Sequence, residues 1–107
     1  AFIFVVSDST DDSSSILTKW LARGRQGEVI DLGVLADRLP LRTERIAHVR
    51  NFCLDRINAS DWTGHDHLIV TDLDDVMAMP VSVESFEQAI DWRYAVVTAC
   101  IEAPQNQ

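Results

Sequence analysis

Short apolar runs alternate with helical patterns along this sequence, and the alternation constrains the fold more than any other feature. Apolar and β-branched runs predict buried strands at residues 2–6, 28–32, 68–71 and 94–101. Apolar side chains at helical spacing predict helices at about residues 16–23, 40–58 and 82–90. Because strands that alternate with helices pair in parallel through crossover connections, we predict an α/β fold. The expected architecture is a three-layer α/β/α, Rossmann-like arrangement around a mainly parallel sheet.

Length, charge and cysteine usage narrow the class of protein. The 107 residues suffice for one domain with a hydrophobic core, so we expect residues 1–107 to form a single domain. A formal net charge of -8 argues against non-specific binding to nucleic acid. Cys53 and Cys100 lack metal-ligand spacing and are expected to be reduced, with a disulfide between them as the open alternative. Because the sequence has no transmembrane run and no targeting signal, we expect a cytoplasmic protein.

The apolar run at residues 68–71 leads directly into three aspartates, Asp72, Asp74 and Asp75. Carboxylates that follow a buried parallel strand lie at the edge of the sheet where open α/β folds bind ligands. Extended backbone would place Asp72 and Asp74 on one side, and residues 67–90 contain no lysine or arginine to neutralise them. Oxygen ligands of this kind suit Mg²⁺ or Mn²⁺. The alternative is that the acidic residues only close the strand into a turn.

Two further polar features accompany the aspartates. Residues 7–15 follow the first strand and open a helix, so their hydroxyl and backbone N–H groups could hold the sugar or phosphate of a nucleotide. An ordinary helix start with capping side chains is the alternative. A single segment carries five of the nine basic residues, Arg38, Arg42, Arg45, Arg50 and Arg56. Arginine suits bidentate contacts with phosphate, although a solvated helix face would have the same composition.

Three motifs in this order resemble the nucleotide-sugar-binding half of a GT-A glycosyltransferase. They are Ser9-Thr10-Asp11-Asp12, Arg50-Asn51 and Asp72-Leu73-Asp74-Asp75. Residues 45–51 resemble in particular the capsule-associated, mannosyltransferase-like branch. Members of the family carry a further strand before this region and an acceptor-binding half after it, so we expect the chain to be an incomplete fragment, inactive alone.

The resemblance implies a metal-dependent glycosyltransferase that takes a UDP- or GDP-sugar as donor. Mn²⁺ or Mg²⁺ would be held by Asp72, Asp74 and Asp75, with Asp72 also facing the ribose or a metal-bound water. Asp8 would lie near the base, and Arg50 near the nucleotide. The expected nucleotide-binding residues are Ser7, Asp8, Ser9, Arg45, Arg50 and Asp72. The resemblance places no catalytic residue in this segment and does not identify the acceptor.

Two alternative functions stay open. The segment from Leu68 to Met77 also resembles the first motif of haloacid-dehalogenase-like phosphatases, in which Asp72 would be the nucleophile and Asp74 the general acid. That reading leaves the loop at residues 7–15 without a role, and no lysine follows Asp75. The other alternative is an α/β domain that binds a nucleotide without catalysis. It draws support from Val6-Ser7, which stands where the glycosyltransferases have an acidic pair.

Overall fold

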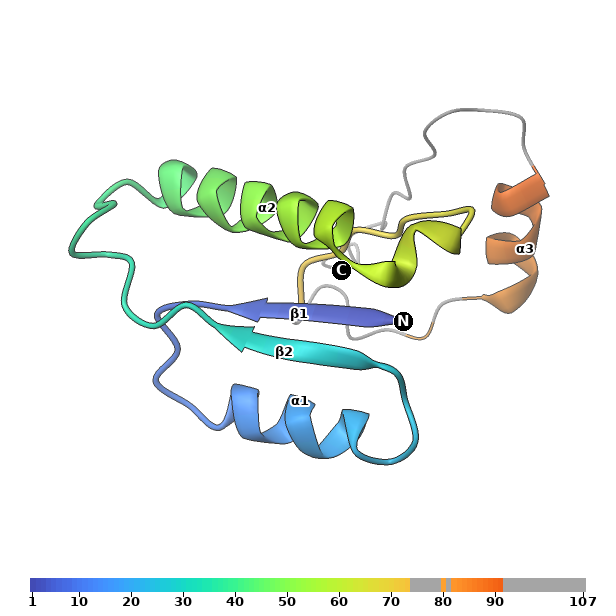
Figure 1. Ribbon diagram of the computed structural model, residues 1–107, viewed down its shortest axis with the longest axis horizontal. Helices are drawn as coiled ribbons and strands as arrows, with labels where there is room; N and C mark the ends of the chain where they lie inside the picture. The colour runs from blue at the N-terminus through green and yellow to red at the C-terminus, as the bar shows by residue number, and fades with distance from the viewer. Residues whose placement is uncertain (74–79, 81, 92–107) are drawn as a thin grey trace, which may run out of the picture. The chain divides into compact units, whose positions relative to one another are not determined.

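The computed structural model describes residues 1–73, 80 and 82–91 (Figure 1). Its elements follow in the order β1 (Phe2–Val6), α1 (Ser13–Leu21), β2 (Gly27–Asp31), α2 (Arg42–Ala59), the 3-10 helix η1 (Asp61–Gly64) and α3 (Val83–Asp91). The chain divides into two units, Ala1–His67 and Leu68–Gln107. Because of this division, the expected single domain over residues 1–107 stays a prediction.

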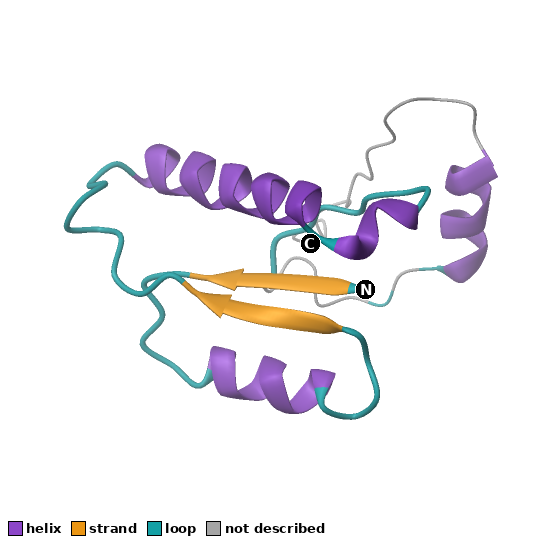
Figure 2. Cartoon of the chain, in the orientation of Figure 1, coloured by secondary structure: helices purple, strands orange, loops and turns teal. Residues whose placement is uncertain are grey.

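β1 and β2 form a parallel pair, in register from Phe2 opposite Gly27 to Val6 opposite Asp31 (Figure 2). Both strands were predicted from their apolar residues, and β2 begins one position earlier than expected. Parallel neighbours need a crossover connection, and α1 supplies it. The structure therefore confirms the α/β class, whereas two strands are too few to establish a three-layer, Rossmann-like sheet.

Side-chain alternation along the strands assigns one helix to each face of the sheet. Trp20 of α1 lies edge-on against Phe2, with ring centroids 4.9 Å apart. Glu28 is opposite Ile3 in the register and therefore points to the other face, where Arg56 of α2 binds it. α1 and α2 thus cover opposite faces of the two strands, as Figure 1 shows. This arrangement leaves the carboxyl ends of both strands open to the loops that follow them.

The most buried apolar side chains of the described residues flank this sheet. Leu21, the last residue of α1, is 8% exposed, and Leu35, in the loop after β2, is 0% exposed. α1 ends because Gly24 adopts a φ of 90°, a left-handed conformation that glycine tolerates, and Arg25 N–H donates to Leu21 C=O at 3.0 Å. The end of the helix near Gly24 agrees with the prediction.

The predicted central strand at residues 68–71 is wrong. Residues 67–73 have no regular secondary structure, and the side chains of Leu68, Ile69 and Val70 are 57%, 64% and 69% exposed. Apolar and β-branched residues favour a strand, but a strand also requires a neighbour that pairs with its backbone. In the described part of the chain the sheet consists of β1 and β2 alone. Asp72 therefore follows irregular backbone and does not lie at a strand end.

The predicted third helix is confirmed as α3 (Val83–Asp91). Ser82 caps it as expected, since its Oγ accepts a hydrogen bond from the Ser85 N–H at 3.3 Å. Its expected buried side is not buried, because Phe86 and Ile90 are each 39% exposed. The fourth predicted strand, at residues 94–101, lies outside the described residues.

Candidate functional site at the carboxyl end of the sheet

The loops after β1 and β2 are joined at the carboxyl edge of the sheet. Leu32 N–H donates to Val6 C=O, and Asp8 N–H donates to Gly33 C=O, both at 2.8 Å. Asp8 has a φ of 52°, in the left-handed region that Asp and Asn enter more readily than most residues. Gly33 is also left-handed, with a φ of 68°. The segments after β1 and β2 therefore both turn sharply directly beyond the last residues that pair in the sheet.

The Asp8 carboxylate binds the backbone of the loop after β2. Its Oδ1 accepts hydrogen bonds from the N–H groups of Leu35, at 2.8 Å, and Ala36, at 3.0 Å. The Ala36 N–H is the strongest of the contacts that hold the pKa of Asp8 below its usual value. Because the Leu35 side chain is fully buried, this carboxylate satisfies a backbone donor beside the core.

Arg45, in the first turns of α2, binds the other end of the same loop. Its Nη1 donates to the carbonyl oxygens of Leu39, at 2.9 Å, and Pro40, at 2.8 Å. Its Nε lies 3.8 Å from Oδ2 of Asp8, and about a quarter of each side chain is exposed. We call this set of contacts the Asp8–Arg45 cluster; its members are Asp8, Leu35, Ala36, Leu39, Pro40 and Arg45.

The serine-rich loop closes on Asp11 at the start of α1. Oδ1 of Asp11 accepts hydrogen bonds from Ser9 Oγ at 2.7 Å, from Ser13 Oγ at 2.5 Å and from the Ser13 N–H at 3.0 Å. The Ser13 and Ser9 hydroxyls are the main reason that the pKa of Asp11 falls to about 2. Ser14 Oγ in turn donates to Asp31, the last residue of β2, at 3.1 Å. Asp12, the cap residue of α1, makes no side-chain hydrogen bond to the helix, so the expected capping is found only next to it, at Asp11, which accepts the Ser13 N–H.

The six predicted nucleotide-binding residues fall into different settings. Ser7 and Asp8 lie at the end of β1, and Ser9 is exposed in the loop that follows. Arg45 belongs to the Asp8–Arg45 cluster, whereas Arg50 is exposed farther along α2. The structure therefore brings Ser7, Asp8 and Arg45 to one edge of the first unit. Asp72, in the second unit, is exposed.

The predicted metal ligands extend beyond the part of the chain that the structure describes. Asp74 and Asp75 lie outside it, and Asp72 is the single predicted ligand within it. In residues 1–73, 80 and 82–91, no three His, Cys, Asp or Glu side chains are grouped closely enough to hold a metal ion. The site for Mn²⁺ or Mg²⁺ thus stays a prediction.

Leu35, Ala36, Leu39 and Pro40 were not predicted to belong to the site. Their contribution is made by backbone N–H and C=O groups, which every sequence carries and which leave no compositional signal. One indirect signal was present, because Gly33 marks a turn after the strand and Leu35 is an apolar residue inside a loop. Neither identifies Asp8 or Arg45 as the partner.

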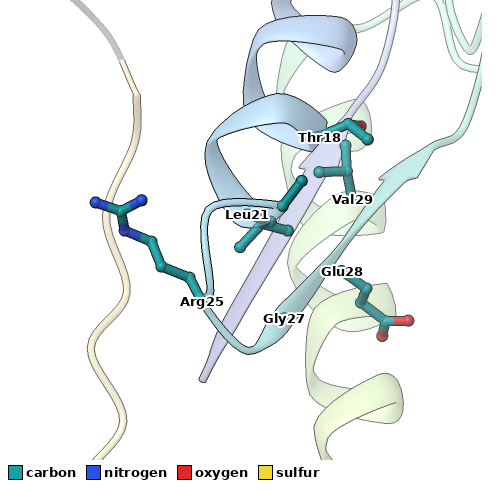
Figure 3. A pocket seen from close by; sticks show the side chains of 7 residues that line it. Thr18, Leu21, Arg25, Gly27, Glu28 and Val29 are labelled. Atoms are coloured by element: carbon teal, nitrogen blue, oxygen red, sulfur yellow. The ribbon is translucent and has the colours of Figure 1, made fainter.

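A pocket of about 370 Å³ lies elsewhere, between the end of α1 and the start of β2 (Figure 3). It is lined by Thr18, Leu21, Ala22, Arg25, Gly27, Glu28 and Val29. Because β2 begins at Gly27, this pocket is at the amino end of the strand, opposite the edge that carries Asp8. It is therefore not part of the predicted nucleotide site.

Comparison with models of known protein families gives no match, and neither does comparison with curated proteins or with solved structures. The described helices offer one further observation: none of them combines the length and apolar character that a membrane crossing requires.

Proposed function

We propose that this chain is the donor-binding part of a metal-dependent glycosyltransferase, and that it takes a UDP- or GDP-sugar. The observation that carries the proposal is the joined pair of loops after β1 and β2, at a sheet edge where Ser7 and Asp8 meet Arg45 of α2. Open α/β folds bind nucleotides outside the carboxyl ends of parallel strands. The resemblance of the Ser9-Thr10-Asp11-Asp12 loop to GT-A enzymes gives independent support.

The sequence Asp72-Leu73-Asp74-Asp75 supports the metal dependence. A donor set made of carboxylates fits Mg²⁺ or Mn²⁺, which bind one or two protein carboxylates and complete their shell with phosphate oxygens and water. When bound, such a cation would neutralise the negative charge of the nucleoside diphosphate that leaves the sugar. The exposure of Asp72 agrees with a group that meets a ligand.

Calorimetric titration of the protein with UDP and GDP, with and without Mn²⁺, tests the proposal. We expect binding that requires Mn²⁺ and is lost in Asp74→Asn. Asp66→Asn is the matched control, because it removes one exposed carboxylate from the same part of the sequence outside the motif. If neither UDP nor GDP bound in the presence of Mn²⁺, or if either bound equally well without it, the proposal would be overturned. If Asp74→Asn and Asp66→Asn weakened binding equally, the aspartate motif would not be the metal site.

A second measurement separates the proposal from its alternatives. The full-length protein should release the sugar of a UDP- or GDP-sugar slowly to water when Mn²⁺ is present, and Asp74→Asn should abolish this release. Nucleotide binding without any such turnover would favour a non-catalytic domain. A beryllofluoride complex on Asp72 in a protein that binds no nucleotide would favour the phosphatase.

A further inference from the structure

We infer that Asp8 and Arg45 are positioning residues, which fix the loop at residues 33–40 and make no direct contact with the nucleotide. The inference rests on the proposed function for its consequence in binding. It departs from the expectation that Asp8 contacts the base and that Arg45 binds the nucleotide. The argument comes from the partners that the polar atoms of the two side chains already have.

Asp8 is engaged with protein through its backbone and its carboxylate. Its N–H donates to Gly33 C=O, and Oδ1 accepts the N–H groups of Leu35 and Ala36. Two amides converging on one oxygen hold the carboxylate in a fixed direction, toward the loop after β2. Its remaining oxygen, Oδ2, faces Arg45. A base that approached this carboxylate would have to compete with the protein's own backbone donors.

Arg45 is engaged in the same way. Its Nη1 is shared between Leu39 C=O and Pro40 C=O, and its Nε faces Asp8. Between these anchor points, the N–H groups of Arg38 and Leu39 donate to Leu35 C=O at 3.0 and 2.8 Å and form a helical turn. The two side chains therefore hold the turn at both ends. The Asp8 carboxylate accepts from the N–H groups at its start, and the Arg45 guanidinium donates to the carbonyl groups at its end.

These contacts have a functional consequence. Asp8 lies in the loop two residues after β1 and Arg45 lies in α2, so the cluster fixes the loop after β2 relative to the loop after β1. A ligand at this edge would then meet the exposed Ser9 and the backbone of the loop that the charged pair holds in place. Positioning groups of this kind change affinity through the groups they orient.

Hydrogen exchange of backbone amides and nucleotide titration, measured on the same variants, test the inference. Asp8→Ala should speed exchange at Leu35 and Ala36 and weaken binding of UDP or GDP with Mn²⁺ by about tenfold. Asp8→Asn keeps an oxygen acceptor for both amides, so it should restore their protection and most of the affinity. Asp37→Asn, an equal loss of charge in the same loop, is the control and should match the wild type in both measurements.

Arg45→Lys provides a second test that does not depend on Asp8→Ala remaining folded. A lysine keeps the charge but lacks the planar group that spans two carbonyls, so exchange at Arg38 and Leu39 should become faster. Arg42→Lys, at an exposed position of the same helix, is its control.

Two results would overturn the inference. In the first, Asp8→Asn loses affinity as fully as Asp8→Ala while both amides stay protected, which would show that the charge touches the ligand. In the second, neither Asp8→Ala nor Arg45→Lys changes amide exchange. If the wild-type protein binds no nucleotide, the proposed function fails, and the exchange data alone then decide whether the cluster positions the loop.

Discussion

The guanidinium of Arg56 binds the carboxylate of Glu28 in a bidentate arrangement, with Nε 2.5 Å from Oε1 and Nη2 2.9 Å from Oε2. The pair connects the last turn of α2 to the start of β2, and the hydrogen bonds from Arg56 hold the pKa of Glu28 below its usual value. The pair is partly exposed to solvent, since 46% of the Arg56 side chain and 29% of the Glu28 side chain are accessible. The pair therefore orients α2 on the sheet more than it stabilises the fold.

Glu28→Gln should lower the thermal unfolding midpoint slightly, and the difference from wild type should shrink as NaCl is raised. Salt screens an exposed ion pair, because the Debye length of the solution falls to about 3 Å at 1 M ionic strength. A double-mutant cycle with Arg56→Gln, followed by circular dichroism, measures the coupling directly. Asp55→Asn removes a neighbouring exposed charge as the control. A coupling that did not change with salt would contradict the prediction.

Leu35→Ala should destabilise the protein by about 2–5 kcal/mol, measured by urea unfolding. Leu35 is 0% exposed, so the substitution leaves a cavity and removes apolar area from the core. Val34→Ala, one residue away and 65% exposed, should change stability by less than about 0.5 kcal/mol. Equal effects of the two substitutions would show that the loop after β2 is not packed as described.

Gly27→Ala should destabilise the protein by about 1–3 kcal/mol, because a Cβ at this position would lie 2.3 Å from the backbone oxygen of Phe2. The two strands would have to separate at the first pair of the register. In Gly64→Ala the added Cβ meets nothing within 4 Å, which makes it the matched control. Thermal unfolding of the two variants checks the difference, and a neutral Gly27→Ala would contradict the close approach.

Acid should remove a contribution of Asp11 to stability. The folded-state pKa of Asp11 is about 2, against an ordinary value of 3.8. The ionised carboxylate therefore stabilises the folded state fully at pH values above 3.8. That contribution is lost as the pH falls from 3.8 toward about 2, since the unfolded chain binds the proton first. A carboxyl NMR titration measures the pKa, and urea unfolding between pH 5 and pH 2 measures the loss.

Asp11→Asn should flatten this acid dependence. Asp12→Asn removes the same charge while the serine hydrogen bonds to Asp11 stay in place, and so separates net charge from hydrogen bonding. If the two variants flattened the profile equally, the serine contacts would not be its cause.

Local patterns predicted the elements whose structure depends on neighbours in the sequence. The apolar run of β1 gave both of its ends correctly, and the helical spacing gave α2 to within two residues of its start and one of its end. In each case the spacing of the apolar side chains along the sequence indicates the type of element and its approximate ends. The same holds for α3, where Ser82 marks the cap.

Contacts between distant residues were beyond such patterns. The Asp8 carboxylate binds amides 27 and 28 positions away, and no composition or spacing links those positions. The run at residues 68–71 shows the opposite error, because its residues favour a strand while its backbone forms none. A strand is decided by its partner as much as by its own side chains.

The left-handed backbone of Asp8 restricts which residues this position can accept. Glycine would adopt the turn without strain but would leave the Leu35 and Ala36 amides without an acceptor, and glutamate would supply a carboxylate on a backbone that resists the turn. Asparagine alone offers both the turn and the oxygen. A library randomised at residue 8 and selected for folded protein should therefore retain two amino acids, aspartate and asparagine, and the ratio between them would measure how much the charge facing Arg45 adds.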